Sequence, residues 1–233
     1  MSSEEGSAVR LRRRDAIVVG GLALGGALAS RTAAAGSLLP SEGAAECVLT
    51  PELTEGPYWI DNSLTRRDIT EGRHGLPLIL RLAVVHADNC RPIKGADVEL
   101  WHADASGEYS GFEGGPGGRT ETRYLRGHQR TNAKGVVRFD TIFPGWYAGR
   151  TPHIHVKVHV GGDEVHTGQL FFNERITRAV YRTRYYASRG EYDTSHSEDN
   201  IYAQGGARST PRLRRRAHGR KGYVGTLTMG VNA

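Results

Sequence analysis

The sequence contains few cysteines, no long hydrophobic run and no internal repeat. Cys47 and Cys90 are the only cysteines in 233 residues, and neither lies beside a His or a second Cys at metal-binding spacing. A cysteine-based metal site is therefore excluded. The longest apolar stretch, residues 16–29, is shorter than the roughly 20 residues that a membrane-spanning helix needs. No nucleic-acid-binding motif is present, so neither a membrane span nor a nucleic-acid partner is expected.

The first 35 residues have the pattern of an export signal. Three arginines at residues 12–14 precede the apolar stretch, and small residues follow it up to Ala35. A basic start, a short apolar middle and a small-residue end are typical of a signal that is removed after export. The arginines also resemble a twin-arginine signal, which transports proteins that fold, and can load a metal, before export. An ordinary secretory signal and a disordered basic tail are the alternatives.

We therefore expect three segments: an export signal over residues 1–35, a flexible lead-in over 36–46, and one domain over 47–233 that acts outside the cell or at its surface. In that oxidising environment an even pair of cysteines predicts one disulfide, between Cys47 and Cys90. The bond would close a loop of about 44 residues.

The chain is moderately basic. Its formal charge is +6, and without residues 1–35 it has 26 basic and 22 acidic residues, which leaves +4. Six of the cations cluster near the end of the sequence: Arg212, Arg214, Arg215, Arg216, Arg220 and Lys221. Because Gly and Pro lie beside them, we interpret the cluster as a solvated loop rather than a site for anionic polymers.

The periodicity after residue 46 is that of an all-β protein. Glycine is abundant, with 31 residues, and its pairs mark turns. Short runs of β-branched and aromatic residues predict strands at 78–85, 98–103, 136–139, 153–160, 169–172 and 223–229. The strict alternation over 153–160 is typical of a half-buried strand. Asn173 is expected to cap one helix over residues 174–186. These features predict a β-sandwich with long loops and at most one or two short helices.

Two histidines and two tyrosines form the candidate metal site. His153 and His155 lie two apart on an expected strand, so their side chains share one face. Tyr147 lies six positions before His153, on a Pro-Gly-Trp-Tyr turn that can fold back over the strand. Tyr109 follows a Gly-Glu pair, and tyrosine binds as phenolate, a hard oxygen donor that suits Fe(III). The structural alternatives are packing for the tyrosines and a solvent-facing histidine row that continues to His159.

Several motifs, in order, resemble the intradiol ring-cleavage dioxygenases, in particular their short, secreted bacterial branch. Residues 95–104 and the following Gly107-Glu108-Tyr109 resemble the strand that leads to that family's first iron tyrosinate, and residues 141–147 resemble the approach to its second. Residues 150–155 are similar to its Arg-x-x-His-x-His signature, residues 169–172 to the next strand, and residues 54–59 to its substrate-side entry loop. The resemblance covers residues 47–232.

This resemblance implies an enzyme with one non-haem Fe(III) per chain. It would use O2 to cleave a small catechol-type diol between the hydroxyls and release a muconate-type diacid. The implied iron ligands are Tyr109, Tyr147, His153 and His155. Arg150 and Tyr147 would be catalytic, Gln169 would orient ligands by hydrogen bonding, and Tyr58 and Trp146 would line the substrate pocket.

Two features depart from the longer members of that family. Only five residues separate Tyr147 from His153, so a pocket-shaping loop is missing, and the helical N-terminal domain that dimerises the cytoplasmic catechol enzymes is absent. Substrate choice and oligomeric state are therefore not carried over, and a homodimer stays one of the assemblies open to it. Two other functions are compatible with the residues: an exported β-sandwich binding module, and a zinc hydrolase that uses His153, His155 and an acid.

Overall fold

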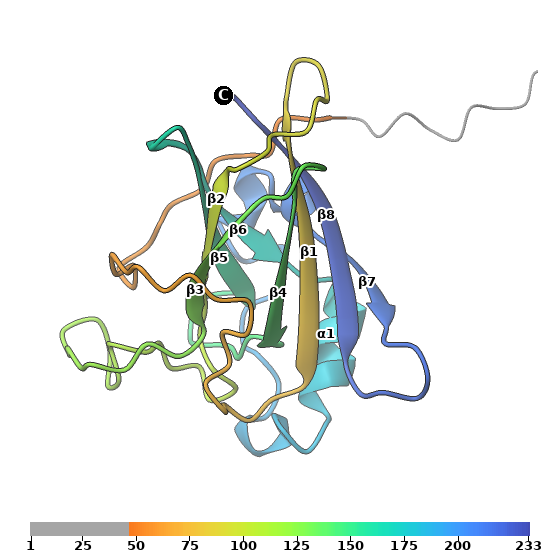
Figure 1. Ribbon diagram of the computed structural model, residues 1–233. Helices are drawn as coiled ribbons and strands as arrows, with labels where there is room; N and C mark the ends of the chain where they lie inside the picture. Colours follow the sequence, from red (N-terminus) through yellow and green to blue (C-terminus); the bar gives the residue numbers. More distant parts are fainter. Residues whose placement is uncertain (1–46) are drawn as a thin grey trace, which may run out of the picture. The chain divides into compact units, whose positions relative to one another are not determined.

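The computed structural model describes residues 47–233, so the expected export signal and lead-in lie outside the described residues. These residues form two four-stranded sheets (Figure 1). Sheet A contains, in spatial order, β4 (Val136–Ile142), β1 (Pro77–His86), β8 (Tyr223–Val231) and β7 (Arg212–Arg215). Sheet B contains β3 (Arg126–Arg130), β2 (Asp97–Trp101), β5 (His153–Val160) and β6 (Asp163–Phe171). The β1–β8 pair is parallel, and the other strand pairs within the sheets are antiparallel.

One α-helix and three short 3-10 helices complete the described fold. The α-helix, α1 (Glu174–Tyr181), lies near the start of β1 and β8 (Figure 1). The 3-10 helices are η1 (Ala187–Arg189), η2 (Tyr202–Gln204) and η3 (Gly206–Ser209). None of the helices in residues 47–233 has the length and apolar character that crossing a membrane requires. The predicted all-β sandwich is thus confirmed.

The main hydrophobic core lies between the two sheets. On β1 the inward residues Leu78, Leu80 and Leu82 are almost fully buried, and they belong to the same apolar cluster as Val98 of β2 and Val156 of β5. Each buried aliphatic side chain of this kind contributes roughly 1.5–3 kcal/mol to stability. The period-2 pattern of each strand therefore fixes which face is apolar and which face is free to carry function.

The strand β5 has the predicted bounds, but the expectation that it is half-buried was wrong. Its residues from His153 to Val158 are all buried. The face opposite the core is covered by the segment of residues 54–60: Lys157 forms an ion pair with Glu55, and its Nζ lies 4.2 Å from the centre of the Trp59 ring. A second layer thus shields this face of sheet B from water.

Two strands were not predicted, most other elements differ from their predicted bounds by one to three residues, and β6 and α1 differ by more. β3 and β7 consist largely of Arg, Gln and His, whose low strand propensity is overcome by pairing with β2 and β8. β6 begins at Asp163 rather than near residue 169. α1 is capped by Asn173 as predicted but ends at Tyr181. The backbone stops being helical after Tyr181, and this brings the side chain of Tyr186 against the start of β1. There its hydroxyl accepts a hydrogen bond from the backbone N–H of Leu76 and donates one to the carbonyl oxygen of Phe143.

The basic cluster near the end of the sequence is a strand and a turn, not only a loop. Residues 212–215 form β7 at the edge of sheet A, and the turn that follows returns the chain to β8. For residues 212–215 the interpretation as a loop was wrong because pairing with β8 fixes the backbone, whereas Arg216, Arg220 and Lys221 do lie in a connecting turn. The side chains of Arg212, Arg214 and Arg215 are nevertheless exposed. A row of cations at a sheet edge also discourages edge-to-edge aggregation.

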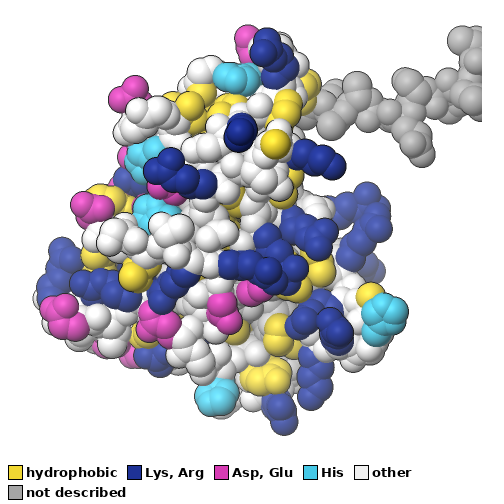
Figure 2. Space-filling view, viewed as in Figure 1, with side chains coloured by type: hydrophobic (Ala, Val, Ile, Leu, Met, Phe, Trp, Pro, Cys, Tyr) yellow, Lys and Arg dark blue, Asp and Glu magenta, His cyan; other side chains and the backbone are white. Residues whose placement is uncertain are grey.

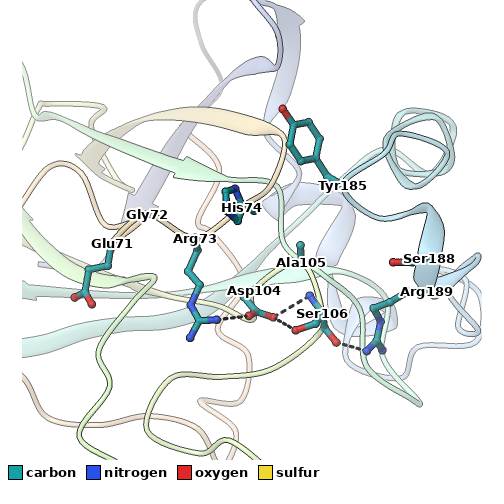
Figure 3. A pocket seen from close by; sticks show the side chains of 10 residues that line it. All are labelled: Glu71, Gly72, Arg73, His74, Asp104, Ala105, Ser106, Tyr185, Ser188 and Arg189. Atoms are coloured by element: carbon teal, nitrogen blue, oxygen red, sulfur yellow. Dashed lines mark hydrogen bonds and ion pairs between the residues drawn. The ribbon is translucent and has the colours of Figure 1, made fainter.

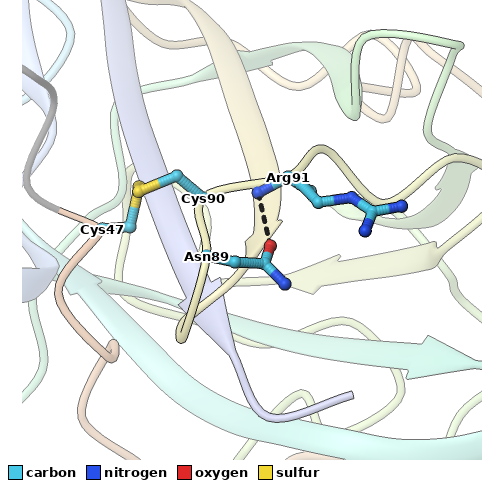
Figure 4. The surroundings of a disulfide bond; sticks show 4 residues. All are labelled: Cys47, Asn89, Cys90 and Arg91. Carbon is cyan, nitrogen blue, oxygen red and sulfur yellow. Dashed lines mark hydrogen bonds between the residues drawn. A yellow bond between two sulfur atoms is a disulfide. The ribbon is translucent and has the colours of Figure 1, made fainter.

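The predicted disulfide is present in the structure. Cys47 and Cys90 are bonded, with their Cα atoms 5.4 Å apart and 43 positions apart in sequence (Figure 4). Cys90 lies in the turn after β1, and residue 49 forms a bridge with residue 230 of β8. The bond therefore attaches the first described residues to the end of sheet A.

Loss of this bond should destabilise the domain. In the chain-entropy model a loop of this length is worth about 4 kcal/mol. We expect the Cys47→Ala/Cys90→Ala double variant to lose about 2–4 kcal/mol of unfolding free energy in urea titrations. The reduced wild type should unfold at the same midpoint as the double variant. An unchanged midpoint in both would show that the bond does not constrain the unfolded chain.

Candidate metal centre

Four side chains bring their polar atoms together above β5. Tyr147 Oη lies 3.0 Å from His153 Nε2, which lies 3.2 Å from His155 Nε2, which in turn lies 3.1 Å from Tyr109 Oη. The four atoms form a continuous chain of close contacts. We call these residues (Tyr109, Tyr147, His153 and His155) the quartet. The structure thus gathers all four candidate metal ligands at one place.

The local folding of three segments explains this convergence. His153 and His155 share the face of β5 that points away from the main core. Tyr109 follows β2, after a turn in which Gly107 N donates to Asp104 O. Tyr147 lies in the loop between β4 and β5. This loop leads directly into His153, the first residue of β5, and folds back so that the Tyr147 hydroxyl lies next to the His153 ring. Sequence-distant residues therefore meet because β2 and β5 are neighbours in sheet B.

A residue that sequence reasoning missed orients one member of the quartet. Trp101 is the direct cross-strand partner of His155, and their rings are stacked 4.8 Å apart with an interplanar angle of 7°. Cross-strand neighbours on one face of a sheet interact in this way. The stacking fixes the plane of the imidazole. Only the strand register, which the local pattern does not contain, could have identified Trp101.

Burial keeps the quartet uncharged when no cation is near. Burial raises the pKa of Tyr109 well above its ordinary value and also raises the pKa of Tyr147, which the charge of Arg150 opposes. Burial, helped by Arg150, lowers the pKa of His153 to about 3. Burial and then His153 lower the pKa of His155 well below its ordinary value. Neutral imidazoles are the form that binds metals, and a bound cation reverses the cost of deprotonating a buried phenol.

The donor set fits a metal ion. His153 Nδ1 lies 2.7 Å from the carbonyl oxygen of Thr151, so this nitrogen carries the proton and Nε2 presents its lone pair to the quartet. Donor atoms that share a cation at about 2 Å are roughly 2.8–3.3 Å apart, which is the spacing observed here. Within residues 47–233 no group of three or more His, Cys, Asp or Glu side chains could hold a metal, so the tyrosines are needed to complete a site.

Arg150 lies beside the quartet and is held on two sides. Its Nε donates to Asp199 Oδ2 at 3.0 Å, and its Nη2 donates to Gln169 Oε1 at 2.5 Å. Gln169 Nε2 in turn donates to the carbonyl oxygen of Thr54 at 2.8 Å. The guanidinium is therefore fixed in direction, and Gln169 orients Arg150 and the segment of residues 54–60 rather than a quartet member.

Asp199 is a second residue that sequence reasoning missed. Its side chain is fully buried, and its carboxylate accepts hydrogen bonds from the backbone N–H of Thr151, Ile201 and Tyr202. Burial opposes its ionisation, but these bonds and the charge of Arg150 outweigh it and hold the pKa of Asp199 below its usual value. Asp199 is thus an anionic anchor for Arg150. Its distance in sequence left no local signal.

The two expected substrate residues lie in different surroundings. The ring of Tyr58 stacks on Tyr109 at 4.3 Å and meets Tyr147 edge-on at 6.0 Å, so Tyr58 lies against the quartet. A cavity of about 100 Å³ opens beside Tyr58, Tyr109 and Phe112. Trp146 packs instead against the main core, with the Arg189 guanidinium 4.7 Å from its ring centre. The structure therefore brings Tyr58, but not Trp146, into the aromatic cluster of the quartet.

Hydrogen bonds connect the loop that carries Tyr109 to the loop that carries Tyr147. The backbone N–H of Gly145 donates to the Asp104 carbonyl at 3.0 Å, and Arg189 donates to the carbonyls of both Ser106 and Trp146. Asp104 also accepts from Arg73 at 3.3 Å and from Ser106 (Figure 3). These contacts border a cavity of about 580 Å³ that no quartet residue lines. Arg189 therefore couples the positions of Tyr109 and Tyr147.

The contact between the loops leaves no room for a side chain at Gly107. It has φ of +85°, and a Cβ there would lie 2.1 Å from the Trp146 carbonyl oxygen. We expect Gly107→Ala to lower the unfolding free energy by about 2–5 kcal/mol and to separate the tyrosines. Gly149→Ala is the matched control, because Gly149 has φ of +78° with nothing within 4 Å of the added Cβ. Its loss should be about 1–2 kcal/mol. Equal losses in urea titrations would contradict the steric argument.

The chain is similar in sequence and in structure to known dioxygenases. Residues 51–176 match the sequence profile of the family described as Dioxygenase. Catechol 1,2-dioxygenase 1 of Acinetobacter lwoffii is 34% identical over 103 residues, which are 42% of this chain and 32% of that protein. The chain thus spans about a third of the length of that curated relative.

Two solved structures match most of the described residues. An intradiol ring-cleavage dioxygenase from Tetranychus urticae has a TM-score of 0.76 and 36% identity, and the match covers 80% of this chain and 95% of that one. The dioxygenase domain of a dioxygenase–carbohydrate-binding protein fusion from Streptomyces sp. SirexAA-E has a TM-score of 0.60 and 29% identity, over 79% of this chain and 99% of that one.

Proposed function

The chain belongs to the intradiol ring-cleavage dioxygenase family, and we propose that it binds one non-haem Fe(III) and uses O2 to cleave catechol-type diols between their hydroxyls. The products would be muconate-type diacids. The observation that carries the proposal is the quartet, in which two phenols and two imidazoles hold their donor atoms 3.0–3.2 Å apart. Phenolates are hard donors, and two of them balance much of the charge of a trivalent ion.

Tyr109, Tyr147, His153 and His155 would hold the iron. When bound, the metal would supply a Lewis-acidic template with redox character. Both tyrosines lie in loops, but Tyr109 is buried and stacked on Tyr58, whereas Tyr147 is half-buried. Tyr147 is therefore better able to move and to take a proton from a substrate hydroxyl at its Oη. This difference supports an acid–base role for Tyr147 and a fixed position for Tyr109.

Arg150 would stabilise negative charge that develops on the substrate. Its guanidinium has a side-chain exposure of 19% and is aimed by Asp199 and Gln169, so little reorganisation is needed when charge appears. The stacked Tyr58 would form an aromatic wall for a flat ring. Gln169 would act indirectly, through Arg150 and the Thr54 carbonyl.

Two alternatives make different predictions about the purified protein. An exported binding module would bind no iron, and a zinc hydrolase would be colourless. The full chain should instead contain about one iron per chain, absorb visible light, and consume O2 with catechol. Product analysis should find the muconate diacid with both oxygen atoms from O2. A ring-opened semialdehyde as the main product, or an active colourless zinc form, would contradict the proposal.

Export and the physiological substrate stay predictions. The export signal is proposed from the residue pattern over 1–35, and the described residues begin at position 47. A panel of catechol, hydroxyquinol, protocatechuate and lignin-derived diols, each followed by O2 uptake, would identify the substrate. Localisation of the full chain in a secreting host, with the arginines at 12–14 changed to Lys as the control, would test the twin-arginine route.

A further inference from the structure

A second hollow lies away from the quartet. It has a volume of about 280 Å³ and is formed by α1, the start of β1 and the β7–β8 hairpin. Its floor is apolar: Leu76, Val180 and Tyr223 line it, and all three are buried members of the main core. No quartet residue lines this hollow. It is therefore a different place on the molecule from the candidate metal centre.

The rim of the hollow is cationic. Arg184, Arg215 and Lys221 line it with exposed side chains, and no Asp or Glu is among its lining residues. Among the ion pairs formed within residues 47–233, none includes any of these three cations. Figure 2 shows Lys and Arg side chains gathered over the β7–β8 hairpin. Like charges facing one hollow without a counter-charge repel each other and attract an anion.

The hairpin backbone fixes this arrangement. Gly222 has φ of +97°, and a Cβ there would lie 1.9 Å from the carbonyl oxygen of Pro77, so the chain returns tightly against β1. Arg215 pairs in register with Tyr223, and its guanidinium carbon lies 5.8 Å from the centre of that ring. On the opposite side, Arg184 Nη2 donates to Tyr185 Oη at 3.2 Å. The hairpin therefore carries cations on one side of the hollow, Arg184 lies on the other side, and the apolar floor lies between them.

We propose that this hollow binds a small aromatic carboxylate, with its ring on the floor of Leu76, Val180 and Tyr223 and its carboxylate among Arg184, Arg215 and Lys221. The volume lies just below the roughly 300–1,000 Å³ of pockets for drug-sized ligands, which suits a single ring. An inorganic anion would leave the apolar floor in contact with water, and a neutral ring would leave the three cations unbalanced. A ligand with both parts covers the apolar floor and also reduces the repulsion among the three exposed cations. The inference does not depend on the proposed function.

The test uses benzoate as the probe, titrated into the full chain and followed by calorimetry and NMR. Benzyl alcohol has the same ring without the charge, and inorganic phosphate has charge without the ring. We expect benzoate to bind at least tenfold more tightly than either. The Arg215→Gln/Lys221→Gln variant should weaken benzoate binding by tenfold or more. Arg212→Gln, on the same strand but outside the hollow, should leave it unchanged.

Two further arms separate this site from the quartet and from simple charge attraction. Benzoate binding should persist in His155→Ala, which removes a quartet member, and Ala179→Trp should block it by filling the hollow. The proposal is overturned by loss of binding in His155→Ala, by equal affinity for phosphate, by no effect of Arg215→Gln/Lys221→Gln, or by a Kd weaker than about 10 mM.

Discussion

The variant His155→Ala should lose its iron, its visible absorption and its activity. His155 Nε2 lies next to both His153 Nε2 and Tyr109 Oη, so its removal takes away the donor at the middle of the quartet. A metal bound by the remaining three donors would be held far more weakly, and substitutions of residues that only support metal ligands already cost 10–100-fold in affinity or activity. We therefore expect iron content below about a tenth of the wild-type value and a rate at least about 10³-fold lower.

Two controls separate metal loss from unfolding. His159→Ala changes a half-buried histidine further along β5, and it should retain iron, colour and rate. Tyr109→Phe keeps the ring that stacks on Tyr58 but removes the phenol oxygen, so it should stay folded by circular dichroism while it loses colour. If His155→Ala and Tyr109→Phe both remained coloured and active, the quartet would not be the metal site. If His159→Ala bleached instead, the ligand set would include His159.

Arg150→Ala should bind catechol yet turn it over about 10²–10³ times more slowly. The loss of one positioned group that stabilises developing charge has an effect of this size. The guanidinium lies beside the quartet without belonging to it, so iron and colour should be retained. Binding should be visible as a shift of the absorption band at a catechol concentration close to that for the wild type. The effect should therefore appear in kcat and much less in KM.

The controls for Arg150 address its structural contacts. Its loss leaves the buried carboxylate of Asp199 with only its three backbone N–H donors, so some stability should be lost as well. Arg150→Lys retains the charge but cannot hold Asp199 and Gln169 with the same fork, and it should have an intermediate rate. Arg182→Ala removes an exposed arginine paired with Glu191 and should change nothing. An unimpaired Arg150→Ala enzyme would show that the proposed role is wrong.

One part of the site could be predicted from local spacing, and the meeting of Tyr109 and Tyr147 with the histidines was expected from the family resemblance. His153 and His155 share a face because they lie two apart on a strand, and Asn173 caps α1 because its side chain reaches Ile176 N. Trp101 and Asp199 contact the site through strand register and a distant loop. Trp101 is far from its partner His155 in the sequence, and Asp199 is far from its partner Arg150. A local sequence pattern therefore cannot identify Trp101 or Asp199 as part of the site.

The fold could be predicted where apolar alternation is strong and not where pairing alone makes a strand. The run over 153–160 was assigned with its correct bounds, although the cover by Glu55 and Trp59 over its outer face was not foreseen. β7 contains three arginines and one leucine, so nothing in its composition favours a strand. Its backbone is ordered by β8, which lies beside it only in the folded domain.

The position of β8 inside sheet A has a consequence for how the domain is made. β8 lies between β1 and β7, and it pairs in parallel with β1, the first strand of the domain. A ribosome must therefore synthesise all the intervening strands before β1 gains its second neighbour. Until then an edge of a central apolar strand is open to misassociation, and contacts over so long a separation form slowly. Folding of sheet A should accordingly be a late event, completed only after β8 has been synthesised.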